Sequence, residues 1–160
     1  MNKKSLHIGA AVLQLLGAIL WFVPAMVYSV GAYNRYTGEN NFSEKASSIT
    51  EIFDGAPIII IFIVALIVLS LLMIVLPIIK KETDKRHKLT YSKVIAIVSL
   101  MIFVALVVIQ YMSMKNYFEY GAICELTIGG WIFIVVHILL IITLFKISGT
   151  KKKQSKDNIE

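Results

Sequence analysis

Four long apolar stretches divide this chain of 160 residues and exclude most kinds of fold. They cover about residues 5–30, 57–79, 94–114 and 131–148, and none contains Asp, Glu or Arg. A helix needs about 20 apolar residues to cross the roughly 30 Å hydrocarbon core of a membrane. Because lipid cannot hydrogen-bond the backbone, apolar stretches of this length are predicted to be helical. The sequence therefore predicts an all-α integral membrane protein, an antiparallel bundle of four transmembrane helices.

The composition supports a membrane protein and disfavours several other classes. Hydrophobic residues make up 58% of the chain and charged residues 16%, against about 45–50% and 25% in soluble domains. A disordered tail, a nucleic-acid-binding domain and a disulfide-rich secreted protein are disfavoured together. Fourteen of the sixteen basic residues are lysines and isoleucine is abundant. This bias is typical of an AT-rich genome, so we expect a bacterial cytoplasmic membrane protein.

The distribution of basic residues predicts the orientation. Thirteen of the sixteen lie at the amino end, between the second and third stretches, or at the carboxyl end. By the positive-inside rule these regions are cytoplasmic. We expect a single membrane domain over 1–160, with outer loops 31–56 and 115–130, an inner loop 80–93 and a cytoplasmic tail 149–160. Both termini are therefore predicted to be inside, and the basic net charge does not indicate nucleic-acid binding.

The first stretch is predicted to be an uncleaved anchor. Its apolar region is longer than the 7–15 residues of a signal peptide, and no clear cleavage site follows it. Cleavage after Ala25 or Ala32 is the alternative.

The first stretch also repeats with a period of seven residues. The three series are His7, Gln14, Trp21 and Tyr28; Ala10, Gly17, Pro24 and Gly31; and Ala11, Ala18, Ala25 and Ala32. On one continuous helix they share a face. Since small residues let membrane helices approach closely, we expect this face to pack inward, with Pro24 bending the helix.

Polar residues inside the stretches are the candidate site. Gln110 and His137 are each a few residues from the outer end of their stretch, so we expect similar depths, bracketed by Trp21 and Tyr28, with Gln14 deeper. The functional interpretation is an outward-facing polar pocket in which His137 titrates. The structural alternative is a hydrogen bond between His137 and Gln110 that holds two helices together.

The outer loops contain few other features. Residues 43–53 are predicted to form a short surface helix on the membrane interface. The aromatic residues near the second outer loop indicate an interfacial belt, or alternatively a ligand platform; they are Tyr117, Phe118, Tyr120 and Trp131. Cys124 is the only cysteine, so it is either inert or bridges two copies.

Two basic clusters on the predicted inner side are suited to contact with anionic lipid headgroups, although we expect them mainly to determine the topology. Their members are Lys80, Lys81, Lys85, Arg86, Lys88, Lys151, Lys152 and Lys153.

The predicted layout resembles that of animal tetraspan proteins such as claudins and tetraspanins in the number of spans and the side of the termini. The cysteine pairs that those families place in their outer loops are missing here, since Cys124 stands alone. We infer no function from this layout.

Catalytic and metal-binding motifs are absent from the sequence. It has no H-E-x-x-H, C-x-x-C, G-x-S-x-G or phosphate-loop pattern, so we expect neither an enzyme nor a cofactor. The leading hypothesis is a non-enzymatic accessory, regulatory or immunity-type partner of another membrane protein, or of itself. The rival is an oligomeric transporter or pore for a small solute, built around His137 and Gln110.

Overall fold

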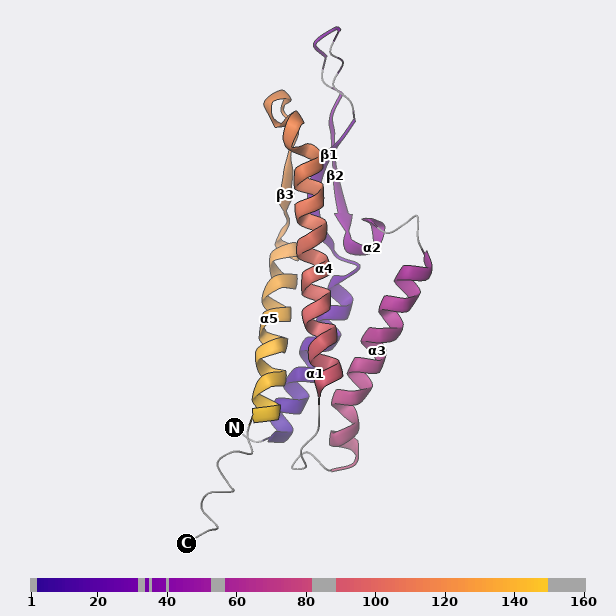
Figure 1. The fold of residues 1–160 in the computed structure, drawn as a ribbon, viewed down its shortest axis with the longest axis vertical. Helices are drawn as coiled ribbons and strands as arrows, with labels where there is room; N and C mark the ends of the chain where they lie inside the picture. The colour runs from indigo at the N-terminus through magenta and orange to yellow at the C-terminus, as the bar shows by residue number, and fades with distance from the viewer. Residues whose placement is uncertain are drawn as a thin grey trace.

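A computed structural model describes residues 3–31, 34, 36–39, 41–52, 57–81 and 89–149. Four long helices lie side by side in it, and a small β-sheet stands at one end of them (Figure 1). The helices are α1 (Lys3–Leu20), α3 (Pro57–Ile79), α4 (Thr90–Met114) and α5 (Ile128–Gly149). Both α1 and α4 contact α3 and α5. The start of α1 and the end of α5 lie at the end away from the sheet, which we call the inner end (Figure 1).

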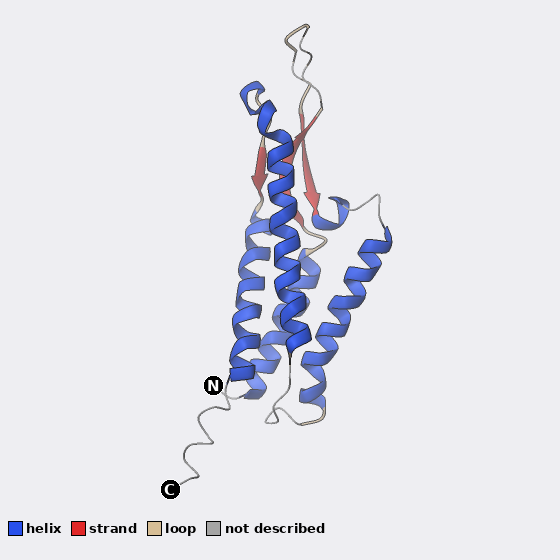
Figure 2. Ribbon diagram, viewed as in Figure 1, coloured by secondary structure: helices blue, strands red, loops and turns tan. Residues whose placement is uncertain are grey.

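Three antiparallel strands form the sheet at the outer end (Figure 2). The central strand is β1 (Pro24–Val30), and its neighbours are β2 (Ser43–Ser48) and β3 (Cys124–Leu126). The sheet therefore joins the chain after α1 to the segment just before α5.

The helix predicted over residues 5–30 is shorter than expected, and the fold is not all-α. The helix α1 ends in a tight turn, in which the Trp21 and Phe22 N–H groups bond to the Ala18 and Ile19 carbonyls. Pro24 does not bend a helix; it opens β1. Proline lacks the N–H that a continuing helix would use, and it is tolerated as the first residue of a strand. Among the later members of the seven-residue series, Pro24, Ala25 and Tyr28 therefore lie on a strand.

The surface helix predicted over 43–53 is also mostly wrong. Residues 43–48 form β2, and only Ile49–Ile52 form a helix, α2. A capping box starts α2: the Glu51 carboxylate accepts from the Ser48 N–H at 2.8 Å, and the Ser48 hydroxyl accepts from the Glu51 N–H at 3.3 Å. Ile49 is fully buried. Phe53 lies outside the described residues.

The start of β1 is bound to the first turn of α5. Thr127 donates from its hydroxyl to the Pro24 carbonyl at 2.6 Å and from its N–H to the Ala25 carbonyl at 3.1 Å. A Cβ at Gly129 or Gly130 would overlap the same two carbonyl oxygens. The Gly-Gly pair therefore lets the strand backbone approach the helix closely.

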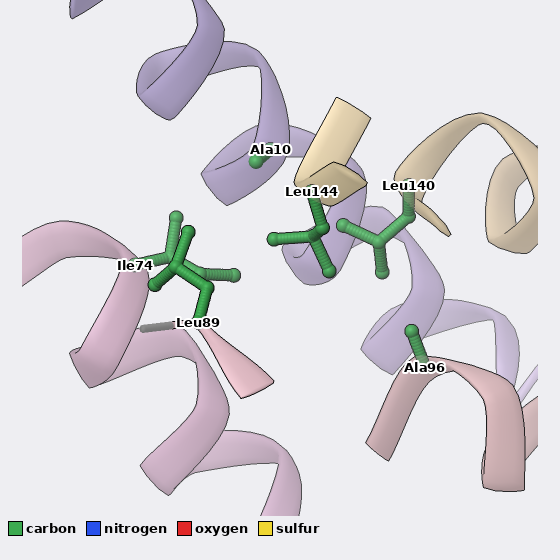
Figure 3. Close-up of a cluster of buried hydrophobic side chains, with 6 residues drawn as sticks. All are labelled: Ala10, Ile74, Leu89, Ala96, Leu140 and Leu144. Carbon is green, nitrogen blue, oxygen red and sulfur yellow. The ribbon is translucent and has the colours of Figure 1, made fainter. Parts of the chain in front are cut away.

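Two clusters of buried apolar side chains form the core. The inner cluster joins all four long helices (Figure 3). Its buried members are Ala10, Ile74, Leu89, Ala96, Leu140 and Leu144. The outer cluster contains three aromatic side chains and lies near the sheet. Its buried members are Trp21, Ala25, Ile49, Ile67, Phe103 and Phe133.

Two helical stretches among the described residues are long and apolar enough to cross a membrane. They are Thr90–Tyr120, which includes the 3-10 helix η1 (Lys115–Tyr120), and Ile128–Ser148. Ile63–Ile79 is a shorter apolar helix within α3, which covers the residues predicted for the second span.

The close approach of β1 to α5 predicts a large difference between two glycine substitutions. We expect Gly130→Ala to destabilise the protein by about 1–3 kcal/mol, because the added methyl group displaces β1. Thermal unfolding in detergent measures the effect. Gly9→Ala is the control, since a Cβ at Gly9 meets nothing within 4 Å. Equal unfolding temperatures for the two variants would contradict the close approach.

Candidate functional site

The interior of the helix set begins at one face of α1. This face buries His7, Ala10, Gln14 and Gly17, with Ala11 and Ala18 partly buried beside them. The opposite face exposes bulky apolar side chains, namely Ile8, Val12, Leu15, Leu16 and Ile19. The small and polar residues of α1 thus point inward. Pro24 and Ala25, expected on the same helix face, lie on β1 instead.

Buried polar groups link three helices in the inner half. The Ser70 hydroxyl of α3 donates to the Gln14 side-chain oxygen at 3.4 Å, and the Ser92 hydroxyl of α4 donates to the Ser70 carbonyl at 3.3 Å. His7 Nδ1 lies 3.3 Å from the Ile74 carbonyl, to which it donates because a carbonyl only accepts. We call His7, Gln14, Ser70 and Ser92 the polar ladder. Hydrogen bonds of this kind between helices hold apolar helices in register.

His137 bonds within its own helix. Its Nδ1 lies 2.9 Å from the Phe133 carbonyl one turn earlier, so the N–H is on Nδ1. The imidazole stacks on the Phe133 ring with centroids 4.0 Å apart. A Cβ at Gly17 would stand 3.1 Å from His137 Cε1. The ring therefore fills the space that the glycine of α1 leaves.

The expected pairing of His137 with Gln110 is wrong. The Phe103 and Phe133 rings contact each other at 4.7 Å, which sets the register of α4 against α5. Gln110 is seven residues outward of Phe103, whereas His137 is four residues inward of Phe133. At 1.5 Å per residue they are about 16 Å apart along the helix axes. The outer ends of α4 and α5 are not level, because α4 continues outward beside the sheet.

Trp21 and Tyr28, which were predicted to bracket His137 and Gln110, lie in different parts of the structure. Trp21 is buried and its ring meets that of Phe133 edge-on at 6.1 Å, so it shares a neighbour with His137. Tyr28 lies on β1, where its hydroxyl accepts a bond from the Ser47 hydroxyl at 3.4 Å. The predicted cluster therefore reduces to Trp21 and His137 around Phe133, with Gln14 in the polar ladder. Gln110 and Tyr28 belong to neither group.

Sequence reasoning missed the role of two serines. They are Ser70, alone on the otherwise apolar α3, and Ser92, near the start of α4. Both are fully buried. A serine alone on an apolar span is the signal that could have indicated an interior position, since lipid offers it no partner.

Among the residues that the structure describes, the outer surface and the charged regions add no second site. Tyr117 and Trp131 are exposed, and the Tyr117 ring meets Phe42 edge-on at 6.2 Å. Cys124 is half-buried on β3, and burial raises the pKa of its thiol. No three metal-ligating side chains of the described residues come together. Lys80 and Lys81 are exposed at the inner end. The remaining members of the two basic clusters, Lys85, Arg86, Lys88, Lys151, Lys152 and Lys153, lie outside the described residues.

The contact of Gly17 with His137 predicts the effect of filling that space. Gly17→Leu should destabilise the protein by about 1–3 kcal/mol, because it forces α1 away from α5. The thermal unfolding temperature in detergent reports the loss. Ile19→Phe is the matched control on the exposed face of α1 and should change little. An equal loss in both variants would refute the inward position of Gly17.

Comparison with known proteins gives no match: no family model, curated protein or solved structure matches this chain.

Proposed function

We propose that the chain is a four-span protein of the bacterial cytoplasmic membrane, with both ends in the cytoplasm. It acts there as a non-enzymatic accessory, regulatory or immunity-type partner of another membrane protein or of a second copy.

The observation that carries the membrane location is the low burial of the most apolar helices. Only 28% of the most apolar window of Thr90–Tyr120 is buried, and 33% of that of Ile128–Ser148. A core helix of a soluble protein would bury most of such a window, since burial removes apolar surface from water. Lipid is the surrounding that these helices fit. At 1.5 Å per residue, α1 measures about 27 Å, close to the hydrocarbon thickness, and α3 is longer.

The positions of the sheet and the basic residues support the proposed orientation. A strand edge cannot face hydrocarbon, because its unpaired backbone groups would lose their partners in water. The sheet therefore belongs outside the hydrocarbon core at the outer end. Lys3, Lys4, Lys80 and Lys81 all lie at the inner end, which the positive-inside rule makes cytoplasmic. Lys80 and Lys81 are also suited to contact anionic headgroups there.

The interior favours a partner protein over a pore within one chain. Polar side chains of the ladder gather in the inner half, and the aromatic rings of Trp21, Phe103 and Phe133 cover them on the outer side. The separation of Gln110 from His137 supports the leading proposal, since the rival oligomeric transporter was predicted around both residues. A transporter built between copies remains the second candidate, with His137 as its titratable group.

The proposed orientation predicts which engineered cysteines react from outside. In a Cys124→Ala background, Tyr36→Cys should react with an impermeant maleimide on intact cells, since Tyr36 is fully exposed at the outer end. Lys81→Cys, exposed at the inner end, should react only after the cells are opened. The reverse pattern of labelling would overturn the topology.

The two candidate functions predict different results in purified form. Under the leading proposal, vesicles holding the protein alone should show no solute or ion flux above protein-free vesicles, and a second membrane protein should co-purify in fixed ratio from native membranes. His137→Gln should retain that protein. Flux by the protein alone that His137→Gln abolishes would establish the transporter instead, because glutamine cannot take up a proton.

A further inference from the structure

The helix α1 and the residues after it have the layout of a secretory signal peptide. Lys3 and Lys4 precede an apolar helical part, residues 6–20. Its 15 residues fall within the range of about 7–15 that is typical of the apolar region of a signal peptide. The stretch over residues 5–30 exceeds that range only because it continues into β1, where the chain is extended and no longer helical.

A cleavage triplet follows the helix at the place where a signal peptide would have one. Signal peptidases cut after A-x-A-like triplets, in which the first and third residues are small. The triplet Val23-Pro24-Ala25 departs from that pattern only at its first position, where valine is a short aliphatic residue. Ala25 is five residues beyond the end of α1. The Ala25–Met26 peptide bond is therefore the bond such an enzyme would cut; the other candidate, after Ala32, lies outside the described residues.

The fold buries this bond. Ala25 is 0% exposed and Met26 is 1% exposed. Their strand pairs with β2 along one edge and with β3 along the other. The Ala25 carbonyl, which a protease has to attack, accepts from the Thr127 N–H at 3.1 Å, and a Cβ at Gly130 would overlap its oxygen. An extended substrate is bound through the backbone groups along its edge, and here those edges are already paired.

We propose that the Ala25–Met26 bond is a latent signal-peptidase site, which stays uncut as long as β1 is docked on α5. Cleavage is a hydrolysis: water adds its hydroxyl to the Ala25 carbonyl carbon, the C–N bond breaks, and the Met26 nitrogen takes up the proton as a new amino terminus. A chain whose β1 does not dock would lose α1, and with it His7 and Gln14 of the polar ladder. The inference rests on the orientation proposed above, since signal peptidases cut on the outer side of the membrane.

The first test uses the purified full chain in detergent with a purified bacterial signal peptidase. Gly130→Ala displaces β1, and cleavage follows the population of the open form, so it should be about 5- to 150-fold faster than in the unchanged chain. Gly17→Leu is the matched control, because it destabilises the chain at the contact of α1 with His137 and leaves the β1 contact unaltered. Mass spectrometry should show a product that begins at Met26.

Two further variants keep this test decisive. Thr127→Val removes the hydroxyl bond to the Pro24 carbonyl without crowding the strand, so it can replace Gly130→Ala if that variant does not fold. Adding Met26→Pro to Gly130→Ala should leave the chain whole, because proline lacks the backbone N–H and restricts the residue before it. Cleavage that Met26→Pro does not prevent, or a chain that stays whole in both Gly130→Ala and Thr127→Val, would overturn the site. Equal rates in Gly130→Ala and Gly17→Leu would overturn the protection by docking.

The same variants in cells separate this inference from the proposed orientation. In detergent the enzyme reaches both ends of the chain, whereas in cells it reaches only the outer side. We expect Gly130→Ala to yield the product that begins at Met26 in both settings, and the unchanged chain to stay whole in cells. Cleavage in detergent but not in cells would support the latent site and overturn the orientation. Full cleavage of the unchanged chain in cells would overturn the protection.

Discussion

The contact between β1 and the first turn of α5 is the constraint on which the outer half of the molecule depends. Thr127 satisfies the carbonyls of Pro24 and Ala25, and the two glycines that follow leave room for the strand backbone. These carbonyls are bound to Thr127, just before α5, and the chain that leaves α1 at Leu20 supplies the central strand of the sheet. In the turn that follows α1, the Trp21 ring contacts Phe133. The Trp21 carbonyl accepts a hydrogen bond from the Thr50 N–H, which brings α2 over the end of α1.

Much of the helical part of the fold could be predicted from the sequence, because apolar length indicates helices and the seven-residue periodicity indicates which face of α1 points inward. The residues of α3 and the inward face of α1 are examples. The change from helix to strand at β1 could not be predicted, since Ala25, Met26 and Val27 are as apolar as a continuing helix would be. Its partners in β2 are polar residues about 20 positions away, and β3 follows about 100 positions away. Pairing over such separations leaves no local pattern to detect.

The errors in the predicted candidate site have separate physical origins. The depths assigned to Gln110 and His137 assumed that the apolar stretches end at the same level. In the structure α4 extends outward beside the sheet, beyond the start of α5. Counting residues inward from the end of each stretch therefore placed Gln110 and His137 at the same depth although they are at different depths. The polar ladder could not be predicted for another reason. His7 and Ser92 bond to the backbone carbonyls of Ile74 and Ser70, and a backbone acceptor leaves no mark in the sequence. Hydropathy contains no information on which carbonyls a side chain can reach.

The unequal lengths of α4 and α5 give the outer face a mechanical property. From the level at which α5 begins, α4 extends about 9 Å further before η1 continues it. Ring contacts tie this extension to its surroundings, with Tyr111 on Phe118 and Tyr117 on Phe42. In a helix of this kind, each added residue moves the end of the helix outward by about 1.5 Å and also rotates it by about 100°. The length of α4 therefore determines both how far the aromatic tip stands beyond the start of α5 and the direction it faces.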